Sequence, residues 1–344
     1  MRTPKQLLNI TGDTTMLSQT VDRLLPVFGA RNFWVVTHTE QAVAVRKELQ
    51  NVPASHVLTE PVGRNTAAAI GLAAIHLIRE YDDAVMAVLP SDSYVADPAR
   101  YRGLVSVAVS LAKRPGNLVV LGIQPTRPEI GYGYIERGKL AVRAFNTRGF
   151  TVRRFTEKPE LSVAEKYVAS GRYLWNAGMF FWRASTFMES LKLFLPVTHE
   201  ALCQLAETIG TRRYNSTLER IYPKLESISV DYAVMEPTTR EKSGAFRVLV
   251  IPAKVGWSDI GSWAAVHELL AAAPEANVSA GPFLALDAQG NYFSSPNKFV
   301  AAIGVRNLIF VETDDAVLLC PRNRSQDVGK IVKWLEEQKV KNLL

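Results

Sequence analysis

Two apolar stretches of the sequence each lead to an aspartate, and together they suggest a divalent metal site. Residues 86–89 are followed by Pro-Ser-Asp92, and residues 248–251 by a segment that ends in Trp-Ser-Asp259. In α/β sheets, ligands collect beyond the carboxyl ends of strands, and paired carboxylates there suit Mg²⁺, which takes hard oxygen ligands and substrate phosphates. The implied chemistry is phosphoryl or nucleotidyl transfer. For either aspartate alone, a turn or a helix cap is an equally good interpretation.

A second candidate segment opens an Ala-rich stretch. Gly63, Arg64, Asn65 and Thr66 follow a short apolar run. Backbone N–H groups at the start of a helix, together with the Arg64 cation, could meet a base edge or a phosphate. The alternative is a plain turn in which Asn65 caps the helix.

Two segments further along combine polar groups with glycine or proline. Gly131, Tyr132 and Gly133 would let the backbone approach a sugar ring beside an aromatic side chain, or form a turn. Glu157 and Lys158 precede a proline at an expected strand end, where Glu157 could accept sugar hydroxyl protons and Lys158 could meet a phosphate. The alternative for this pair is a surface ion pair of little energetic weight.

Residues 175–180 set an amide among apolar side chains. Asn176 can both donate and accept hydrogen bonds, and Gly178 follows it closely, so the segment could read hydroxyl stereochemistry. Packing in the core is the other interpretation, because Trp, Met and Phe in one cluster are usually buried. Residues 229–236 indicate a helix start capped by Ser229 or Asp231, for which a structural role is favoured.

The elements that must position these residues alternate between strand and helix. Strands are expected at 33–37, 56–59, 84–89 and 118–123, and helices at 40–50, 66–81 and 98–113. Because parallel strands need crossover connections, this alternation predicts an α/β, Rossmann-like, mostly parallel sheet with helices on both faces. Further strands are expected at 132–136, 150–157 and 246–251, and helical stretches at 162–170 and 187–222.

The last part of the chain has a different pattern. Short β runs at 283–286, 300–303, 308–312 and 317–319 precede an expected helix at 325–341. They predict a small β appendage with a closing helix, and no tandem repeat is evident. The expected domains are therefore residues 1–275 and residues 276–344.

Composition narrows the classes of function. The net charge of +7 comes from 40 basic and 33 acidic residues that are interspersed, which fits small anionic ligands better than nucleic acid. Cys203 and Cys320 form no CxxC motif, so neither a disulfide framework nor a zinc site is indicated. The sequence shows no signal core and no membrane span. We therefore expect a cytoplasmic protein without a membrane partner.

The histidines and serines do not indicate a hydrolase. All five histidines lie outside the candidate motifs, and no G-x-S-x-G elbow is present. Displacement at phosphorus by a phosphate oxygen needs no general base, because a phosphate monoester is already anionic near neutral pH, its second pKa being ~6.

The order of these segments resembles that of the sugar-1-phosphate nucleotidyltransferases. Pro-Lys5-Gln, Asp92, the glycines at 131–133, Glu157-Lys158-Pro, Asn176-Ala-Gly178 and Trp-Ser-Asp259 follow one another as in the members that act on mannose 1-phosphate. The resemblance implies a nucleotidyltransferase fold with a small tail like a left-handed β-helix. The implied reaction joins GTP and mannose 1-phosphate to give GDP-mannose and pyrophosphate.

The resemblance also implies roles for single residues. Asp92 and Asp259 would hold Mg²⁺, Lys158 would bind the sugar phosphate, and Glu157, Asn176 and Gly131 would contact the mannose. The segment from Gly63 to Thr66 would lie near the guanine or its ribose. The expected catalytic residues are Lys5, Asp92, Lys158 and Asp259, and the expected substrate-binding residues are Gly63, Arg64, Asn65, Thr66, Gly131, Tyr132, Gly133, Glu157, Asn176 and Gly178.

The sequence departs from the family pattern near its start. The family carries G-G-x-G-x-R-x-x-P before Pro-Lys-Gln, whereas this sequence opens at Met1 and reaches Lys5 at once. Loss of one transition-state hydrogen-bond donor costs ~2.7–4 kcal/mol, so the chain as written is expected to have low activity. A start codon placed too late is favoured over a truncation or a degenerate paralogue that binds without turnover. Ser93 stands where a histidine is usual, which is expected to change a neighbouring contact rather than the metal ligand.

Three further expectations follow. Another sugar-1-phosphate nucleotidyltransferase remains an alternative function, because the residues alone do not specify a base pocket. The sequence ends at Leu344 without room for a fused isomerase domain, so no mannose-6-phosphate isomerase activity is expected. A homodimer is left open.

Overall fold

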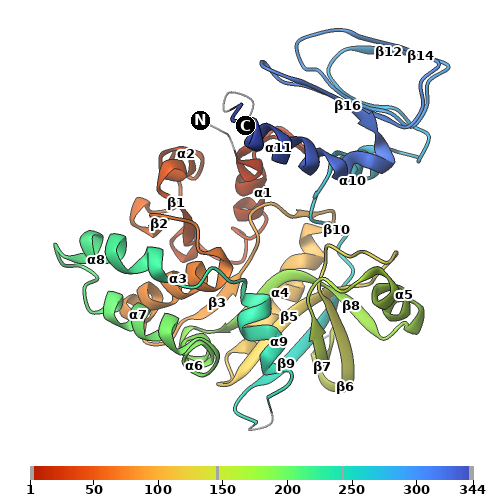
Figure 1. Cartoon of the computed structure of the whole chain (residues 1–344). Helices are drawn as coiled ribbons and strands as arrows, with labels where there is room; N and C mark the ends of the chain where they lie inside the picture. The colour runs from red at the N-terminus through yellow and green to blue at the C-terminus, as the bar shows by residue number, and fades with distance from the viewer. Residues whose placement is uncertain (1–3, 145–146, 242–243, 341–344) are drawn as a thin grey trace. The chain divides into compact units, whose positions relative to one another are not determined.

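The computed structural model describes residues 4–144, 147–241 and 244–340 (Figure 1). The chain divides into two compact units. The core unit comprises residues 17–91 and 95–257. The tail unit comprises the described parts of Met1–Met16, Asp92–Tyr94 and Ser258–Leu344.

A six-stranded sheet forms the centre of the core unit. In spatial order its strands are β3 (Val85–Val88), β8 (Tyr173–Arg183), β5 (Asn117–Ile123), β9 (Arg247–Ala253), β7 (Thr147–Thr156) and β6 (Tyr134–Ala144). Two further ladders join β1 (Val35–His38) to β2 (Val57–Glu60) and β4 (Tyr94–Val95) to β10 (Trp257–Ser258).

The strand directions are more mixed than the sequence predicts. The pairs β1–β2 and β5–β9 are parallel, whereas β8 runs antiparallel to β3 and β5, and β7 runs antiparallel to β6 and β9. Successive strands such as β6 and β7 can pair antiparallel through a short connection, without the crossover helix that parallel neighbours need. The regular strand–helix alternation, from which a parallel sheet is expected, stops before β6.

Helices cover both faces of this sheet, as expected for the α/β class. Alternate residues of β5 enter different hydrophobic cores because side chains of a strand point to opposite faces. Leu118 and Val120 pack in a core with α3 (Asn65–Glu80), and Val119 and Leu121 in a core with α4 (Pro98–Ala112). All four side chains are fully buried.

The remaining helices are shorter than expected in places. They are α1 (Met16–Asp22), α2 (Ala42–Glu48), α5 (Leu161–Ser170), α6 (Ala184–Phe194), α7 (Pro196–Ala206), α8 (Tyr214–Ile221), a π-helix η6 (Asp231–Met235), α9 (Glu236–Thr238), α10 (Trp263–Leu270) and α11 (Val328–Glu337). Short 3₁₀ turns are η1 (Lys5–Leu7), η2 (Ala30–Asn32), η3 (Thr39–Gln41), η4 (Ala54–His56), η5 (Tyr222–Lys224) and η7 (Arg322–Asp327). The expected long helix at 187–222 is divided, and Pro196 starts α7 at a position where proline is well tolerated.

The tail unit is a small β coil. Its strands are β11 (Val278–Ala280), β12 (Phe283–Leu286), β13 (Tyr292–Ser294), β14 (Val300–Ile303), β15 (Leu308–Glu312) and β16 (Val317–Pro321). The pairs β11–β13, β13–β15 and β12–β14 are parallel. Val278 pairs with Tyr292, and Tyr292 with Ile309, so one turn of the coil takes 14 residues and the next takes 17.

The tight turns between strands, here called corners, recur at equivalent places in successive turns of the coil, although the sequence shows no evident repeat. Asp287 and Gly304 have positive φ angles of 50° and 67°, and Gly290 and Asn307 have 66° and 53°. Each pair is separated by the 17 residues that relate Gln289 to Arg306 in the coil. Because Asn, Asp and Gly all tolerate left-handed backbone, different residue types fill equivalent corners and hide the repeat.

Candidate active site

The core unit brings together several of the residues expected to contact a sugar. Glu157 and Lys158 come directly after β7, and Lys158 has a left-handed backbone with φ 45°. The Glu157 side chain is only 8% exposed, whereas that of Lys158 is 57% exposed. Lys158 Nζ lies 3.6 Å from Glu157 Oε1. Within the described residues, Glu157 Oε2 is buried without a hydrogen-bond partner. Such an acceptor is well suited to a ligand hydroxyl.

Gly133 allows this carboxylate to approach the backbone. A Cβ atom at residue 133 would lie 2.4 Å from Glu157 Oε2 and 3.2 Å from Asn176 Cβ. The Asn176 N–H donates to the Gly133 carbonyl over 2.8 Å. The two-glycine segment therefore does more than turn the chain, because its second glycine makes room for both polar side chains.

Tyr132 lies in an aromatic group. Its ring meets Trp175 at a centroid distance of 5.2 Å and Trp257 at 5.5 Å, both edge to face. Aromatic pairs of this geometry are favourable, so they fix the tyrosine that the sequence places between the two glycines.

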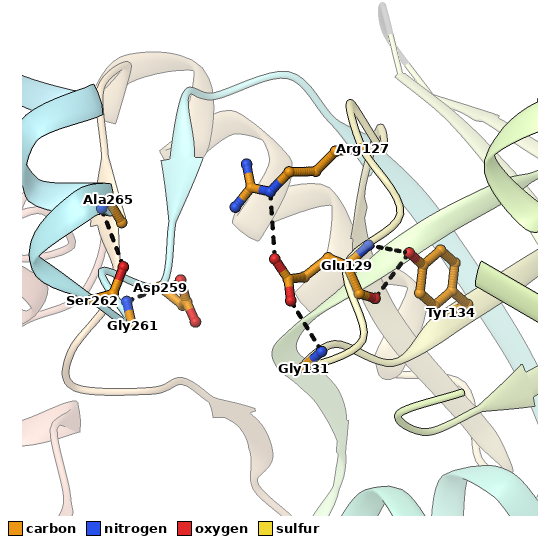
Figure 2. Close-up of polar contacts among 8 residues, drawn as sticks. All are labelled: Arg127, Glu129, Gly131, Tyr134, Asp259, Gly261, Ser262 and Ala265. Atoms are coloured by element: carbon orange, nitrogen blue, oxygen red, sulfur yellow. Dashed lines mark hydrogen bonds and ion pairs between the residues drawn. The ribbon is translucent and has the colours of Figure 1, made fainter. Parts of the chain in front are cut away.

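Gly131 is held by a neighbouring carboxylate in this structure (Figure 2). The Gly131 N–H donates to Glu129 Oε1 over 3.1 Å, and Arg127 Nε donates to Glu129 Oε2 over 3.4 Å. The Tyr134 hydroxyl accepts from the Glu129 N–H and donates to the Glu129 carbonyl. The loop before β6 is thus braced from both sides of Glu129, a residue absent from the sequence-based set.

The amide of Asn176 is bonded at both of its ends. Asn176 Nδ2 donates to Asp231 Oδ1 over 2.7 Å, and Asn176 Oδ1 accepts from the Gly178 N–H over 3.0 Å. Gly178 has φ 68° and lies within the stretch, between Asn176 and Phe180, where β8 shifts its register against β5. A bulge of this kind re-aims a side chain, and here it turns a strand residue toward η6. Asp231 was expected to have a structural role only.

Electrostatics in this cluster favour the neutral form of Glu157. Burial, and next the negative charge of Asp231, raise the pKa of Glu157 to about 7, although Lys158 opposes the shift. Burial also raises the pKa of Asp231, although the Asn176 hydrogen bond opposes that shift. Two carboxyl groups in one buried place cannot both ionise easily, so this cluster changes protonation near neutral pH.

The segment expected near the base adopts a specific backbone. Asn65 has φ 61° and opens α3, and its Oδ1 accepts from the Thr66 N–H over 2.8 Å. The Arg64 guanidinium donates to the Pro223 carbonyl. Gly63 and Asn65 are exposed. In this structure the arginine therefore braces the chain, and Gly63, Asn65 and Thr66 are the exposed residues of the segment.

The tail unit brings together the two motif aspartates through a lysine. Lys5 Nζ donates to Asp92 Oδ2 over 3.1 Å and to the backbone carbonyl of Asp259 over 2.5 Å. The Lys5 side chain is 31% exposed and that of Asp92 is 42% exposed. These aspartates are far apart in the sequence, and the structure brings both into contact with Lys5, one through its carboxylate and the other through its backbone carbonyl.

The turn after Asp259 is tightly constrained (Figure 2). Asp259 Oδ1 accepts from the Gly261 N–H over 3.1 Å, and Ser262 Oγ accepts from the Ala265 N–H over 3.3 Å at the start of α10. Ile260 has φ 46°. The hydrogen bonds of this Asx-type turn and helix cap fix the backbone on which Asp259 is carried.

A magnesium ion is compatible with this pair. In the described parts of the chain, no three His, Cys, Asp or Glu side chains gather into a group that could hold a metal alone. Asp92 and Asp259 supply hard carboxylate oxygens, and Mg²⁺ is usually bound by one or two carboxylates together with substrate phosphates and water. The donor set therefore fits Mg²⁺ that arrives with a nucleotide.

The histidines have other contacts. Burial lowers the pKa of His76 to about 4, and its Nε2 lies 2.8 Å from the Tyr214 hydroxyl. His267 Nε2 lies 2.8 Å from the Ala276 carbonyl. Both histidines therefore have contacts within the fold, whereas the absence of a histidine base from the reaction stays a prediction.

Comparison with known proteins gives the class of the chain. It matches the family model described as Nucleotidyl transferase over residues 1–275, and the model described as MannoseP isomerase/GMP-like beta-helix domain over residues 281–335. The chain belongs to the nucleotidyl transferase family, which confirms the resemblance drawn from its motifs and the α/β fold with a β-helix-like tail.

The names of individual relatives are more specific than the family description. The chain is 39% identical over 337 residues to the Xanthan biosynthesis protein XanB of Xanthomonas campestris pv. campestris (strain B100), covering 97% of this chain and 68% of that protein. It is 39% identical over 338 residues to a mannose-1-phosphate guanylyltransferase of Klebsiella pneumoniae, covering 97% of this chain and 69% of the relative.

A solved structure has the same fold over nearly the whole chain. The crystal structure described as mannose-1-phosphate geranyltransferase from Thermus thermophilus is 33% identical, with a TM-score of 0.84. The match covers 97% of this chain and 92% of the other. Among the residues described here, we find no helix with the length and apolar character needed to cross a membrane.

Proposed function

We propose that this protein is a mannose-1-phosphate guanylyltransferase, which converts GTP and mannose 1-phosphate to GDP-mannose and pyrophosphate. The observation that carries the proposal is the buried Glu157 carboxylate beside the exposed Lys158 ammonium. An unpartnered acceptor for a hydroxyl next to a cation for a phosphate matches the two ends of a sugar 1-phosphate. The names of the relatives at 39% identity support mannose as the sugar and guanosine as the nucleoside.

The reaction is a displacement at the α-phosphorus of GTP. An oxygen of the sugar phosphate forms the new P–O bond, the bond to the β-phosphate bridging oxygen breaks, and pyrophosphate leaves with that electron pair. Such transfers depend mainly on positioning and on neutralisation of charge. Lys158 binds the attacking phosphate, while Glu157 and Asn176 orient the sugar ring.

The remaining motif residues serve the nucleotide. Asp92 and Asp259 would hold Mg²⁺, which supplies neutralisation of phosphate charge when bound. Lys5 holds the two aspartates near each other, because its ammonium group contacts both the Asp92 carboxylate and the Asp259 carbonyl. Gly63 and Asn65 offer backbone and amide groups to the guanine or the ribose, and Gly131 offers its N–H to the sugar once Glu129 releases it.

The test is a comparison of substrates. Pyrophosphate release is measured with the four combinations of GTP or UTP and mannose 1-phosphate or glucose 1-phosphate, with and without Mg²⁺. The proposal expects the highest kcat/KM for GTP with mannose 1-phosphate, and loss of turnover on removal of Mg²⁺ with a chelator. Preference for UTP and glucose 1-phosphate would replace the proposal with the sibling activity.

We also propose a cytoplasmic homodimer. Several apolar side chains of the tail unit are exposed, among them Leu284 at 54%, Ile303 at 70% and Trp334 at 56%. Exposed apolar groups gathered on short elements favour association with a second surface. Light scattering of the purified protein tests the dimer, and a monomer at all concentrations would exclude it. Fractionation of cells tests the compartment.

A further inference from the structure

Asp231 contacts the side-chain amide of Asn176, a residue expected to bind the sugar. Asp231 itself is not among the expected functional residues. It opens η6, a π-helix of five residues. Single π turns are rare and occur frequently at functional sites. Its carboxylate accepts from Asn176 Nδ2 over 2.7 Å, which is at the short end of the range for N–H···O hydrogen bonds.

This contact determines the orientation of the Asn176 amide. The Gly178 N–H can only donate, so the amide oxygen must face it, and the amide nitrogen must face the Asp231 carboxylate. One of the two amide N–H bonds is thereby used. The second N–H is the donor that Asn176 can offer to a sugar oxygen, in a single direction.

The same carboxylate acts on Glu157. Three charged groups influence that side chain, namely Asp231 of η6, Glu236 of α9 and the adjacent Lys158. Asp231 is the stronger of the two negative neighbours. Its charge favours the protonated form of Glu157, which can donate to a sugar oxygen as well as accept, whereas the ionised form can only accept.

The chain before Asp231 is tied to the segment expected near the base. The Val230 N–H donates to Thr66 Oγ1 over 2.8 Å, and the Ala67 N–H donates to the Ile228 carbonyl over 3.2 Å. These bonds fix the start of η6 against α3. Asp231 is therefore held from the backbone side while its carboxylate holds Asn176.

We propose that Asp231 is a positioning residue for sugar recognition, which fixes the Asn176 amide in one orientation and places a second carboxylate beside Glu157. The proposal rests on the proposed function for its substrate, a sugar 1-phosphate. It assigns Asp231 to the sugar and not to the nucleotide.

The first test compares three variants by steady-state kinetics. Asp231→Ala removes both the acceptor and the charge, so KM for mannose 1-phosphate is expected to rise on the order of tenfold or more while KM for GTP changes less than about twofold. Asp231→Asn keeps an acceptor oxygen for Asn176, so a smaller rise is expected. Asp83→Asn is the matched control, because Asp83 is a core-unit carboxylate bound to Arg183 and Ser185 outside this cluster. An equal rise in both KM values for Asp231→Ala would overturn the proposal.

The second test needs no turnover. The pKa of the Glu157 carboxyl is measured by ¹³C NMR in the ligand-free protein, where Asp231→Asn is expected to lower it and Asp83→Asn is not. The Asn176 side-chain amide signals are expected to shift in Asp231→Ala. Unchanged values in both measurements would overturn the inference even if the kinetics changed. Absence of GDP-mannose formation by the wild type would instead overturn the proposed function, and the NMR result would still decide the role of Asp231.

Discussion

The two candidate clusters of this protein are built in opposite ways. In the core unit, Glu157 is 8% exposed, and its Oε2 has no hydrogen-bond partner in the part of the chain that the structure describes. The neighbouring Asn176 amide is hydrogen-bonded at both ends. In the tail unit, Asp92 is 42% exposed and is paired with Lys5, whose side chain is 31% exposed. Reading hydroxyl groups needs acceptors and donors in fixed directions, because a wrong hydroxyl then leaves a buried group unpaired. The cluster in the tail unit is expected to neutralise phosphate charge instead. Its carboxylates would be joined by Mg²⁺ and the substrate phosphates when these bind.

The largest effect is expected where charge neutralisation is lost. Asp92→Asn and Asp259→Asn are each expected to lower kcat/KM at least about 10²-fold, because the loss of one group that stabilises transition-state charge has this magnitude. Pyrophosphate release measures the change, and thermal melting is expected to stay close to wild type, since the Asp92 side chain is 42% exposed and its ion pair with Lys5 is partly solvated. Asp314→Asn, on an exposed turn of the tail unit, is the control. Near-normal rates in both active-site variants would remove the metal assignment.

The next effect concerns the sugar acceptor. At pH 8, above the raised pKa of about 7, Glu157→Gln replaces a charged acceptor with a neutral amide. There kcat/KM for mannose 1-phosphate is expected to fall about 10-fold to 100-fold, in line with ~1.5–3 kcal/mol for a hydrogen bond to a charged group. KM for GTP is expected to stay constant. Equal losses of kcat/KM for mannose 1-phosphate and for GTP would show that Glu157 does not act on the sugar alone.

A smaller effect is expected from filling the space at Gly133. Gly133→Ala places a methyl group 2.4 Å from Glu157 Oε2, which must move the carboxylate, and overpacking of this kind costs roughly 1–3 kcal/mol. We expect a several-fold rise in KM for mannose 1-phosphate and a lower melting temperature. Gly103→Ala on α4 is the matched control, since a Cβ there meets no atom within 4 Å. A wild-type KM in Gly133→Ala would show that Glu157 tolerates displacement.

The smallest effect is on stability as a function of pH. The pKa of Glu157 is raised to about 7 in the folded protein, so between its ordinary value and pH 7 the folded state binds more protons than the unfolded state. Stability from this group therefore falls as pH rises through that window. Urea unfolding at pH 5 and pH 8 is expected to show that Glu157→Gln gains stability relative to wild type at pH 8, by roughly 1–3 kcal/mol. An identical difference at both pH values would contradict the raised pKa.

Local sequence features indicate which residues belong to each cluster, but they do not indicate which residues contact one another. Glu157, Asn176 and Gly133 are each recognisable from their neighbours, and the structure brings them together, although sugar binding by them stays a prediction. Asp231 is missed because its partner Asn176 is 55 residues away in the chain. A carboxylate at a helix start carries the same local signal as an ordinary cap.

For the fold as well, local sequence patterns predict the elements but not the long-range contacts between them. The helices on both faces of the sheet and the small β tail follow from periodicity, whereas the antiparallel direction of β8 depends on long-range pairing that periodicity does not encode. The turns of the coil are hidden because Asp287 and Gly304 occupy equivalent corners with different side chains. Arg64 was expected at a ligand, but its guanidinium donates to the Pro223 carbonyl, a contact made possible only by tertiary structure.

The π turn at Asp231 also has a consequence for how this family can diverge. A π segment accommodates one residue more than the equivalent α-helical turn, and each residue of an α-helix rotates the chain by about 100°. Deleting a single residue from η6 (Asp231–Met235) would restore ordinary helical spacing and turn another side chain toward Asn176. We therefore expect that a one-residue deletion in η6 changes the side chains next to Asn176, as a substitution would.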